Sequence, residues 1–114
     1  MNAPRRTLKE RIGFDAGRRL PAEEAIEFAG ANDVFFMDIQ TDLEPNSFES
    51  FDDARCDRIR KLKDRFGIRL GLHTLSGVNV AEISPFCRDA VDEYLRAYVD
   101  LSQKLDADWI VVHG

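Results

Sequence analysis

Strand-like apolar runs alternate with segments of helical periodicity along this 114-residue chain. The strand-like runs are expected at residues 11–17, 33–39, 68–74 and 109–113, and the helices at residues 21–30, 52–66 and 84–105. The repeat length is roughly 35 residues, about the size of one increment of a βαβ unit. Because such crossovers are right-handed and place helices outside the strands, the pattern predicts a parallel α/β sheet. Either a doubly wound sheet or half of an eight-stranded barrel fits this order.

The segment 84–105 carries the strongest helical signal in the sequence. Ser84 and Pro85 open it, because proline is favoured in a first helical turn. Its apolar stripe then follows the helical period for about five turns and consists of Ala90, Val91, Tyr94, Leu95, Tyr98, Leu101 and Leu105. Tyr94 and Tyr98 are therefore expected in the core. Trp109, at the start of the last strand, is expected in the core or on the floor of a barrel.

The segment 52–66 has both a start and a stop signal for a helix. Asp52 or Asp53 can cap its N-terminus, and Gly67 can end it in the left-handed conformation. The segment also carries a run of basic side chains, namely Arg55, Arg58, Arg60, Lys61, Lys63 and Arg65. Since acidic residues are interleaved with them, the run is interpreted as a solvated helix face.

Composition bounds the class of protein and its partners. The formal net charge of −5 argues against a nucleic-acid partner, because binding to the phosphate backbone needs clustered Lys and Arg. No segment approaches the roughly 18 to 20 apolar residues of a membrane span, and the N-terminal residues lack the apolar core of a secretory signal. We expect a cytoplasmic protein with no membrane partner, a flexible leader at residues 1–10 and one domain over residues 11–114. Cys56 and Cys87, which have no close Cys-x-x-Cys spacing, are expected to be reduced packing thiols.

Two of the strand-like runs end in histidine, at His73 and His113. Side chains alternate along a strand, so His73 shares a face with Arg69 and Gly71, while the opposite face of that strand is entirely apolar. If the apolar face packs on the helices, both histidines point toward the inside of a closing sheet. Loops beyond the C-terminal ends of parallel strands carry the chemistry of such folds.

Carboxylates stand at the corresponding ends of the first two strands. The same alternation lets Asp38 project from the end of the second strand and Asp15 from the end of the first. Imidazole and carboxylate are common ligands of zinc and similar divalent metals. The sequence therefore predicts that His73 and His113 hold a metal or bind substrate, and that Asp38 takes part in substrate binding.

Three pieces of the sequence resemble the xylose isomerase-like TIM-barrel superfamily, which includes sugar and sugar-phosphate isomerases and epimerases and the endonuclease IV enzymes. They are Gly-Leu-His-Thr ending at Thr74, Asn79 with the long helix from Ser84, and Trp-Ile-Val-Val-His-Gly ending at Gly114. The similarity spans roughly residues 11–114. It implies strands one to four of a (β/α)8 barrel whose C-terminal mouth holds a divalent metal, either zinc, manganese or magnesium.

The resemblance places His73 and His113 at the histidines that end strands three and four of the family barrel. It implies zinc ligation there in endonuclease IV relatives, and substrate binding or orientation more often in the isomerase and epimerase branch. The neighbourhood of Asp38 replaces the glutamate usual at the end of strand two. A whole barrel takes about 250 residues, so further metal ligands and the catalytic acids and bases would come from later strands.

Three functions are consistent with these observations. The first is the N-terminal half of a metal-dependent sugar or sugar-phosphate isomerase or epimerase, which transfers a proton beside a carbonyl and is incomplete for catalysis as this chain alone. The second is an endonuclease IV-like phosphodiesterase, which the acidic composition disfavours. The third is a non-catalytic half-barrel that pairs with another chain, or with a second copy, through exposed sheet edges.

Overall fold

The computed structural model describes residues 7–114 and shows strands and helices alternating as the sequence predicts. The strands are β1 (Gly13–Asp15), β2 (Phe36–Gln40), β3 (Arg69–His73) and β4 (Trp109–Val111). The helices are α1 (Leu8–Arg11), α2 (Ala22–Ala31), α3 (Asp53–Phe66) and α4 (Pro85–Leu105), with a 3-10 turn, η1 (Phe48–Ser50), between β2 and α3. All four strands are parallel, and their order in the sheet, β1-β2-β3-β4, is their order in the sequence.

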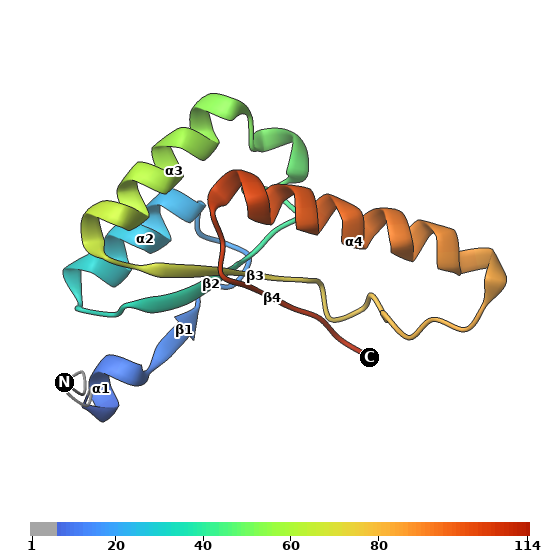
Figure 1. Ribbon diagram of the computed structural model, residues 1–114, viewed down its shortest axis with the longest axis horizontal. Coiled ribbons are helices and arrows are strands. Elements are labelled where there is room, and N and C mark those ends of the chain that lie inside the picture. The colour runs from blue at the N-terminus through green and yellow to red at the C-terminus, as the bar shows by residue number, and fades with distance from the viewer. Residues whose placement is uncertain (1–6) are drawn as a thin grey trace, which may run out of the picture.

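The long helices α2, α3 and α4 all lie on one side of the sheet (Figure 1). The core fills the space between these helices and the outward-facing side chains of the strands. Met37 and Ile39 of β2 and Leu70 and Leu72 of β3 are almost completely buried there. This confirms that the apolar face of β3 packs on the helices, so the other face, which carries His73, points away from the helical layer.

The predicted ends of α3 are confirmed in detail. The Asp52 side chain accepts a hydrogen bond from the backbone N–H of Arg55, and Gly67 follows the last turn with a left-handed φ of 65°. That conformation costs an L-residue with a Cβ atom free energy, which is why glycine suits this position. The start of α4 at Pro85, after Ser84, is confirmed as well.

Two expectations about side-chain burial are corrected by the structure. The basic run of α3 is not wholly solvated, because Arg55 and Lys63 are 8% and 5% exposed. Arg55 is paired with Glu23 of α2. Of the two thiols expected to be packed, Cys56 is buried but Cys87 is exposed near the start of α4.

The strands are shorter than the apolar runs suggest. The last ladder ends at Val111, and His113 rejoins the sheet through a single parallel bridge to Asn79. The expected leader also overlaps structured residues, because Thr7 caps the short helix α1 in a capping box with Glu10. The rest of that segment, residues 1–6, lies outside the described residues. No helix of the described chain is long and apolar enough to cross a membrane.

Candidate metal and substrate site

The inner face of the sheet, away from the helices, carries one row of residues that crosses all four strands. Asp15 of β1 is paired with Asp38 of β2, Asp38 with Gly71 of β3, and Gly71 with Trp109 of β4. Because all strands are parallel and in this register, their C-terminal ends bring polar side chains together at one edge of the sheet. The row explains why residues far apart in sequence meet there.

His73 lies at the centre of this cluster, with each ring nitrogen facing a different neighbour. Its Nδ1 atom is 3.3 Å from Oδ2 of Asp15 and 3.5 Å from Oδ2 of Asp38. Its Nε2 atom is 3.1 Å from Nε2 of His113. The two imidazole rings are tilted by 30° and their centroids are 5.2 Å apart. The structure therefore brings together His73, His113, Asp38 and Asp15, the four strand-end groups that the sequence singles out.

Asp15 is held by two further contacts. Its Oδ1 atom accepts a hydrogen bond from the backbone N–H of Gly17, and its Oδ2 atom accepts one from the Gln40 side chain, at 3.0 Å. The carboxylate is thus directed toward His73 by its own turn and by the neighbouring strand. Gln40 is a site neighbour that the sequence analysis missed, although its position two residues after Asp38 places it on the same face.

Asp38 is the most enclosed carboxylate of the cluster, with a side chain 15% exposed. Burial raises its pKa, and the charge of nearby Asp15 raises it further, while contacts with His73 and the Trp109 indole act in the opposite direction. The net effect is a pKa above the ordinary aspartate value. A desolvated carboxylate beside a second acid forms a site that a cation, or a proton, would stabilise.

Two polar atoms in the cluster lack a hydrogen-bond partner within the described protein. Oδ1 of Asp38 and Nδ1 of His73 are both buried and unpaired. Nδ1 of His73 is close to both carboxylates, but the directions do not form a regular hydrogen bond. Buried polar atoms without partners are rare in folded proteins, so each one needs an explanation. A ligand or ion that binds at the site is one such explanation.

A cleft of about 450 Å³ opens next to the cluster, between the ends of β1, β3 and β4 and the loop that follows β3. His73 and His113 line it together with Asp15 and Arg18, and residues 74–78 form its opposite wall. The loop is tied to the end of β4, since the backbone N–H of Thr74 donates to Val111 and that of Val80 to His113. This cleft is large enough for a small polar molecule to reach both histidines.

Trp109 occupies the floor beneath the site. Gly71 carries no side chain, and the Trp109 indole lies over it, so closely that a Cβ atom on Gly71 would be 1.9 Å from the indole nitrogen. The indole thereby reaches toward Asp38, with which it lines a shallow hollow of about 250 Å³ on the inner face. This agrees with the expected place of Trp109 at a barrel floor.

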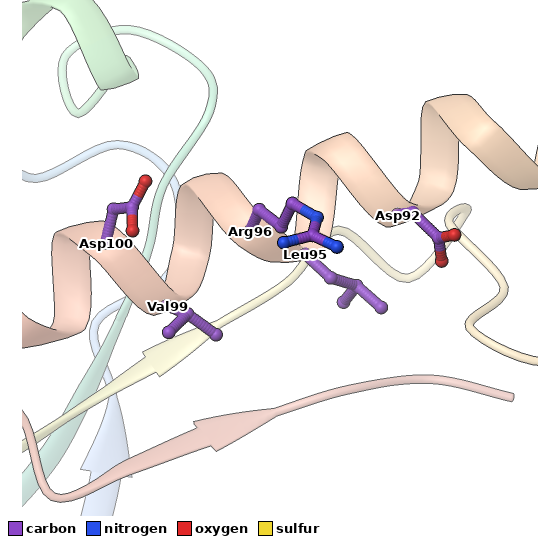
Figure 2. A pocket seen from close by; sticks show the side chains of 5 residues that line it. All are labelled: Asp92, Leu95, Arg96, Val99 and Asp100. Carbon is purple, nitrogen blue, oxygen red and sulfur yellow. The ribbon is translucent and has the colours of Figure 1, made fainter.

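A second hollow, of about 490 Å³, lies away from this cluster, along α4 (Figure 2). Figure 2 shows Leu95 and Val99 on the side of α4 nearer the β4 ribbon, flanked by charged side chains of the same helix. Its lining contains no histidine, and all of its lining residues come from α4. It is therefore a gap in the outer layer beside β4 rather than a site for chemistry.

Comparison with known proteins identifies related folds but no close sequence. No protein-family model matches this chain, and no curated protein matches it significantly. Among solved structures, a D-psicose 3-epimerase crystallised in the presence of D-fructose is 17% identical, with a TM-score of 0.69, over 86% of this chain and 35% of that one. Endonuclease IV from Thermus thermophilus is 20% identical, with a TM-score of 0.73, over 89% of this chain and 39% of that one.

A D-psicose 3-epimerase from Clostridium cellulolyticum, solved with D-tagatose, is 14% identical with a TM-score of 0.69, and this chain again covers 35% of it. Such identities establish the fold alone. They confirm the expected fold class, parallel β/α repeats that form part of a TIM barrel, and they exclude the alternative of a doubly wound sheet. The chain spans little more than a third of the length of these neighbours.

Proposed function

We propose that the chain is the N-terminal half of a barrel enzyme that uses a divalent metal to isomerise or epimerise a sugar or a sugar phosphate. One observation carries this proposal: His73 stands between two carboxylates and a second histidine at the C-terminal ends of four parallel strands. The leader at residues 1–10, the single half-barrel domain at residues 11–114 and a cytoplasmic location belong to the same proposal.

The donor set of the cluster fits a divalent metal. One oxygen each of Asp15 and Asp38 and one ring nitrogen of His73 lie within 4.8 Å of one another, so both acids stand beside the histidine that would hold the metal. The two histidine Nε2 atoms are 3.1 Å apart, close to the roughly 3.3 Å expected for two nitrogens bound to one tetrahedral zinc at 2.0–2.1 Å. The unpaired buried atoms of Asp38 and His73 also favour a site that takes up a ligand.

His73 and His113 would hold the metal through their Nε2 atoms, and Asp15 and Asp38 would support His73 rather than act as ligands. The Nδ1 atom of His73 then faces Asp15 and Asp38, and a metal-bound histidine commonly donates its other ring N–H to a carboxylate. In this arrangement the two acids fix the tautomer and the orientation of the ring. Asp38 lines the hollow on the inner face rather than the cleft, and its carboxylate would bind a substrate hydroxyl that extends into this hollow.

The chemistry divides between the metal and the chain. A bound divalent metal supplies polarisation of a substrate oxygen, which makes a proton on the adjacent carbon easier to remove. By holding the metal at the cleft, His73 and His113 would position a substrate oxygen there, and residues 74–78 line the same cleft. The acids and bases that move the proton belong to the part of the barrel beyond these four strands, so this chain alone is expected to lack turnover.

Metal titration of the full 114-residue chain tests the proposal. Isothermal titration with Zn²⁺ and with Mn²⁺ is expected to show one site, and His73→Ala or His113→Ala is expected to weaken it at least 100-fold. Asp38→Asn is expected to weaken it about 10- to 100-fold, because an orienting carboxylate modulates a ligand rather than replacing it. All proteins carry Cys87→Ser, so that the exposed thiol does not bind zinc.

The matched control is Asp57→Asn, which removes an exposed carboxylate of α3 outside the cluster. Unchanged affinity in both histidine variants, or a loss as large in Asp57→Asn, contradicts the metal proposal. Adding the remaining half of a homologous barrel as a separate chain then separates the enzyme classes. Conversion of a ketose supports the isomerase or epimerase, whereas cleavage of abasic-site DNA supports the endonuclease IV-like phosphodiesterase instead.

A non-catalytic half-barrel that pairs with another chain is the second candidate, and a specific observation favours it. Strands β1 and β4 stand at the two edges of the sheet, and parallel edges with free backbone groups invite pairing. Beside β4 the outer surface carries exposed apolar side chains, including Val99 and Val112 at 47% and 46% exposure. Light scattering is expected to show a defined dimer if copies pair, and a stable monomer at high concentration excludes pairing of copies.

A further inference from the structure

Two tyrosines of α4 form a chain of hydroxyl groups beneath the site. Tyr98 is completely buried, and its hydroxyl lies 3.2 Å from the backbone oxygen of Thr41 and 3.4 Å from that of His73. The Tyr94 hydroxyl lies 3.3 Å from the Tyr98 hydroxyl and accepts the backbone N–H of Leu75 at 3.1 Å. These hydrogen bonds therefore join the ends of β2 and β3 to α4, the helix that covers them.

The direction of these hydrogen bonds is fixed by their ends. Leu75 N–H is a donor and the backbone oxygens of Thr41 and His73 are acceptors, so the Tyr94 hydroxyl donates to Tyr98, and the single O–H of Tyr98 is shared between the Thr41 and His73 oxygens. Each of the three donors, Leu75 N–H, Tyr94 O–H and Tyr98 O–H, therefore has an acceptor. Burial raises the pKa of Tyr98, so its hydroxyl keeps its proton throughout the neutral range.

Aromatic packing holds the two rings in place. Phe48 of η1 meets Tyr98 edge to face, with centroids 5.0 Å apart, and it meets Tyr94 in the same way at 6.3 Å. The two tyrosine rings are themselves 5.0 Å apart. Because the rings are fixed by packing, the hydroxyls act as rigid points to which the strand ends are attached.

We propose that Tyr98, supported by Tyr94, is a positioning residue for His73. Its hydroxyl fixes the peptide of His73 relative to β2, and thereby fixes the distance between the His73 ring and the carboxylate of Asp38. The part of this inference that concerns metal affinity rests on the function proposed above, whereas the part that concerns the His73 ring does not. Tyr98 touches no substrate in this arrangement and acts only through the strand ends.

Tyr98→Phe tests the inference, since it removes one oxygen and keeps the ring on which Phe48 packs. The chain has only two histidines, so ¹H–¹³C NMR spectra of the imidazoles resolve His73 and His113 separately. We expect Tyr98→Phe to shift the His73 ring signals and to lower zinc affinity 3- to 10-fold. Ser102→Ala is the control, because it removes an exposed hydroxyl from the same helix that bonds only within that helix.

The outcomes separate positioning from simple stabilisation. A fall in thermal stability with His73 ring signals and zinc affinity unchanged overturns the inference. If wild-type protein binds no zinc, the metal proposal fails, and the His73 ring signals alone decide the positioning role. If Tyr98→Phe does not fold, Tyr94→Phe carries the test: a shifted His73 ring signal supports the inference, and an unchanged one overturns it.

Discussion

Arg55 of α3 forms the most extensive buried polar network outside the strand ends, and replacing it is expected to be costly. Its guanidinium makes two hydrogen bonds to the Glu23 carboxylate, at 2.8 and 3.0 Å, and one to Asn46 at 2.9 Å. It also donates to Ser50 and Pro45 and lies over the Phe51 ring. The network ties α2 and α3 to the loop that leaves β2 at the site edge.

The expected cost of Arg55→Met follows from this burial. Breaking a buried ion pair costs about 3 to 5 kcal/mol, because the remaining charge is left desolvated without its partner. Glu23 is 26% exposed and recovers part of its hydration, so we expect the lower end, about 3 kcal/mol. For a domain of this size, that loss lowers the melting temperature by roughly 10 to 20 °C.

Urea unfolding followed by far-UV circular dichroism measures the change, with Lys61→Met as the matched control. Lys61 pairs with Asp57 on the exposed side of the same helix, at 2.8 Å, and a solvated pair of this kind contributes little. Lys61→Met is therefore expected to match wild type within error. Equal losses in the two variants refute the argument from burial.

The pH dependence gives a second check on the same pair. Burial alone would raise the pKa of Glu23, but its hydrogen bonds and the charges of Arg55 and Arg58 hold it below the ordinary glutamate value. The stability gained from the pair is therefore present above the ordinary pKa and lost as pH falls through the lowered one. The difference between wild type and Arg55→Met should shrink in acid, and a constant difference contradicts the assignment.

Three further predictions concern single positions near the sheet. Gly71→Ala forces the Trp109 indole to move, so we expect a loss of about 1 to 3 kcal/mol and a shift in fluorescence of this single tryptophan; an unchanged spectrum contradicts the contact. Gly67→Ala meets no atom within 4 Å but retains a φ of 65°, so urea unfolding should show a loss of about 1 kcal/mol with unchanged fluorescence. Asp38 has a raised pKa, so its ionised form costs stability, and metal-free Asp38→Asn should unfold at higher urea than wild type at pH 7. That gain should begin to shrink as pH falls below the raised pKa and should be gone below the ordinary aspartate pKa, and a variant less stable at pH 7 contradicts it.

Features set by local sequence could be predicted well. The ends of α3 depend on Asp52 and Gly67, each of which acts within one turn of the helix. The inward direction of His73 depends only on the alternation of side chains along β3. The approach of Asp15 and Asp38 to His73 followed from the same alternation once the strands were taken as parallel.

Features that depend on distant partners could not be predicted from the sequence. Arg55 is buried because Glu23, on another helix, supplies the opposite charge, and no local pattern distinguishes it from its solvated neighbours. The hydroxyl of Tyr98 bonds to backbone oxygens of β2 and β3, whereas its place on an apolar stripe indicates only burial. The predicted end of β4, at His113, is also wrong. The strand ends at Val111, and His113 pairs with Asn79, a residue of the loop after β3.

The strand order β1-β2-β3-β4, identical to the order in the sequence, has a consequence for how the chain acquires its structure. Each strand pairs with its immediate predecessor, so a growing polypeptide never has to wait for a distant partner before it extends the sheet. Each pairing closes a loop of one repeat, which costs less loop-closure entropy than pairing strands from opposite ends of the chain. Synthesis on the ribosome can therefore add one strand–helix unit at a time to a template already in place, and His113 would meet His73 when the fourth strand is added.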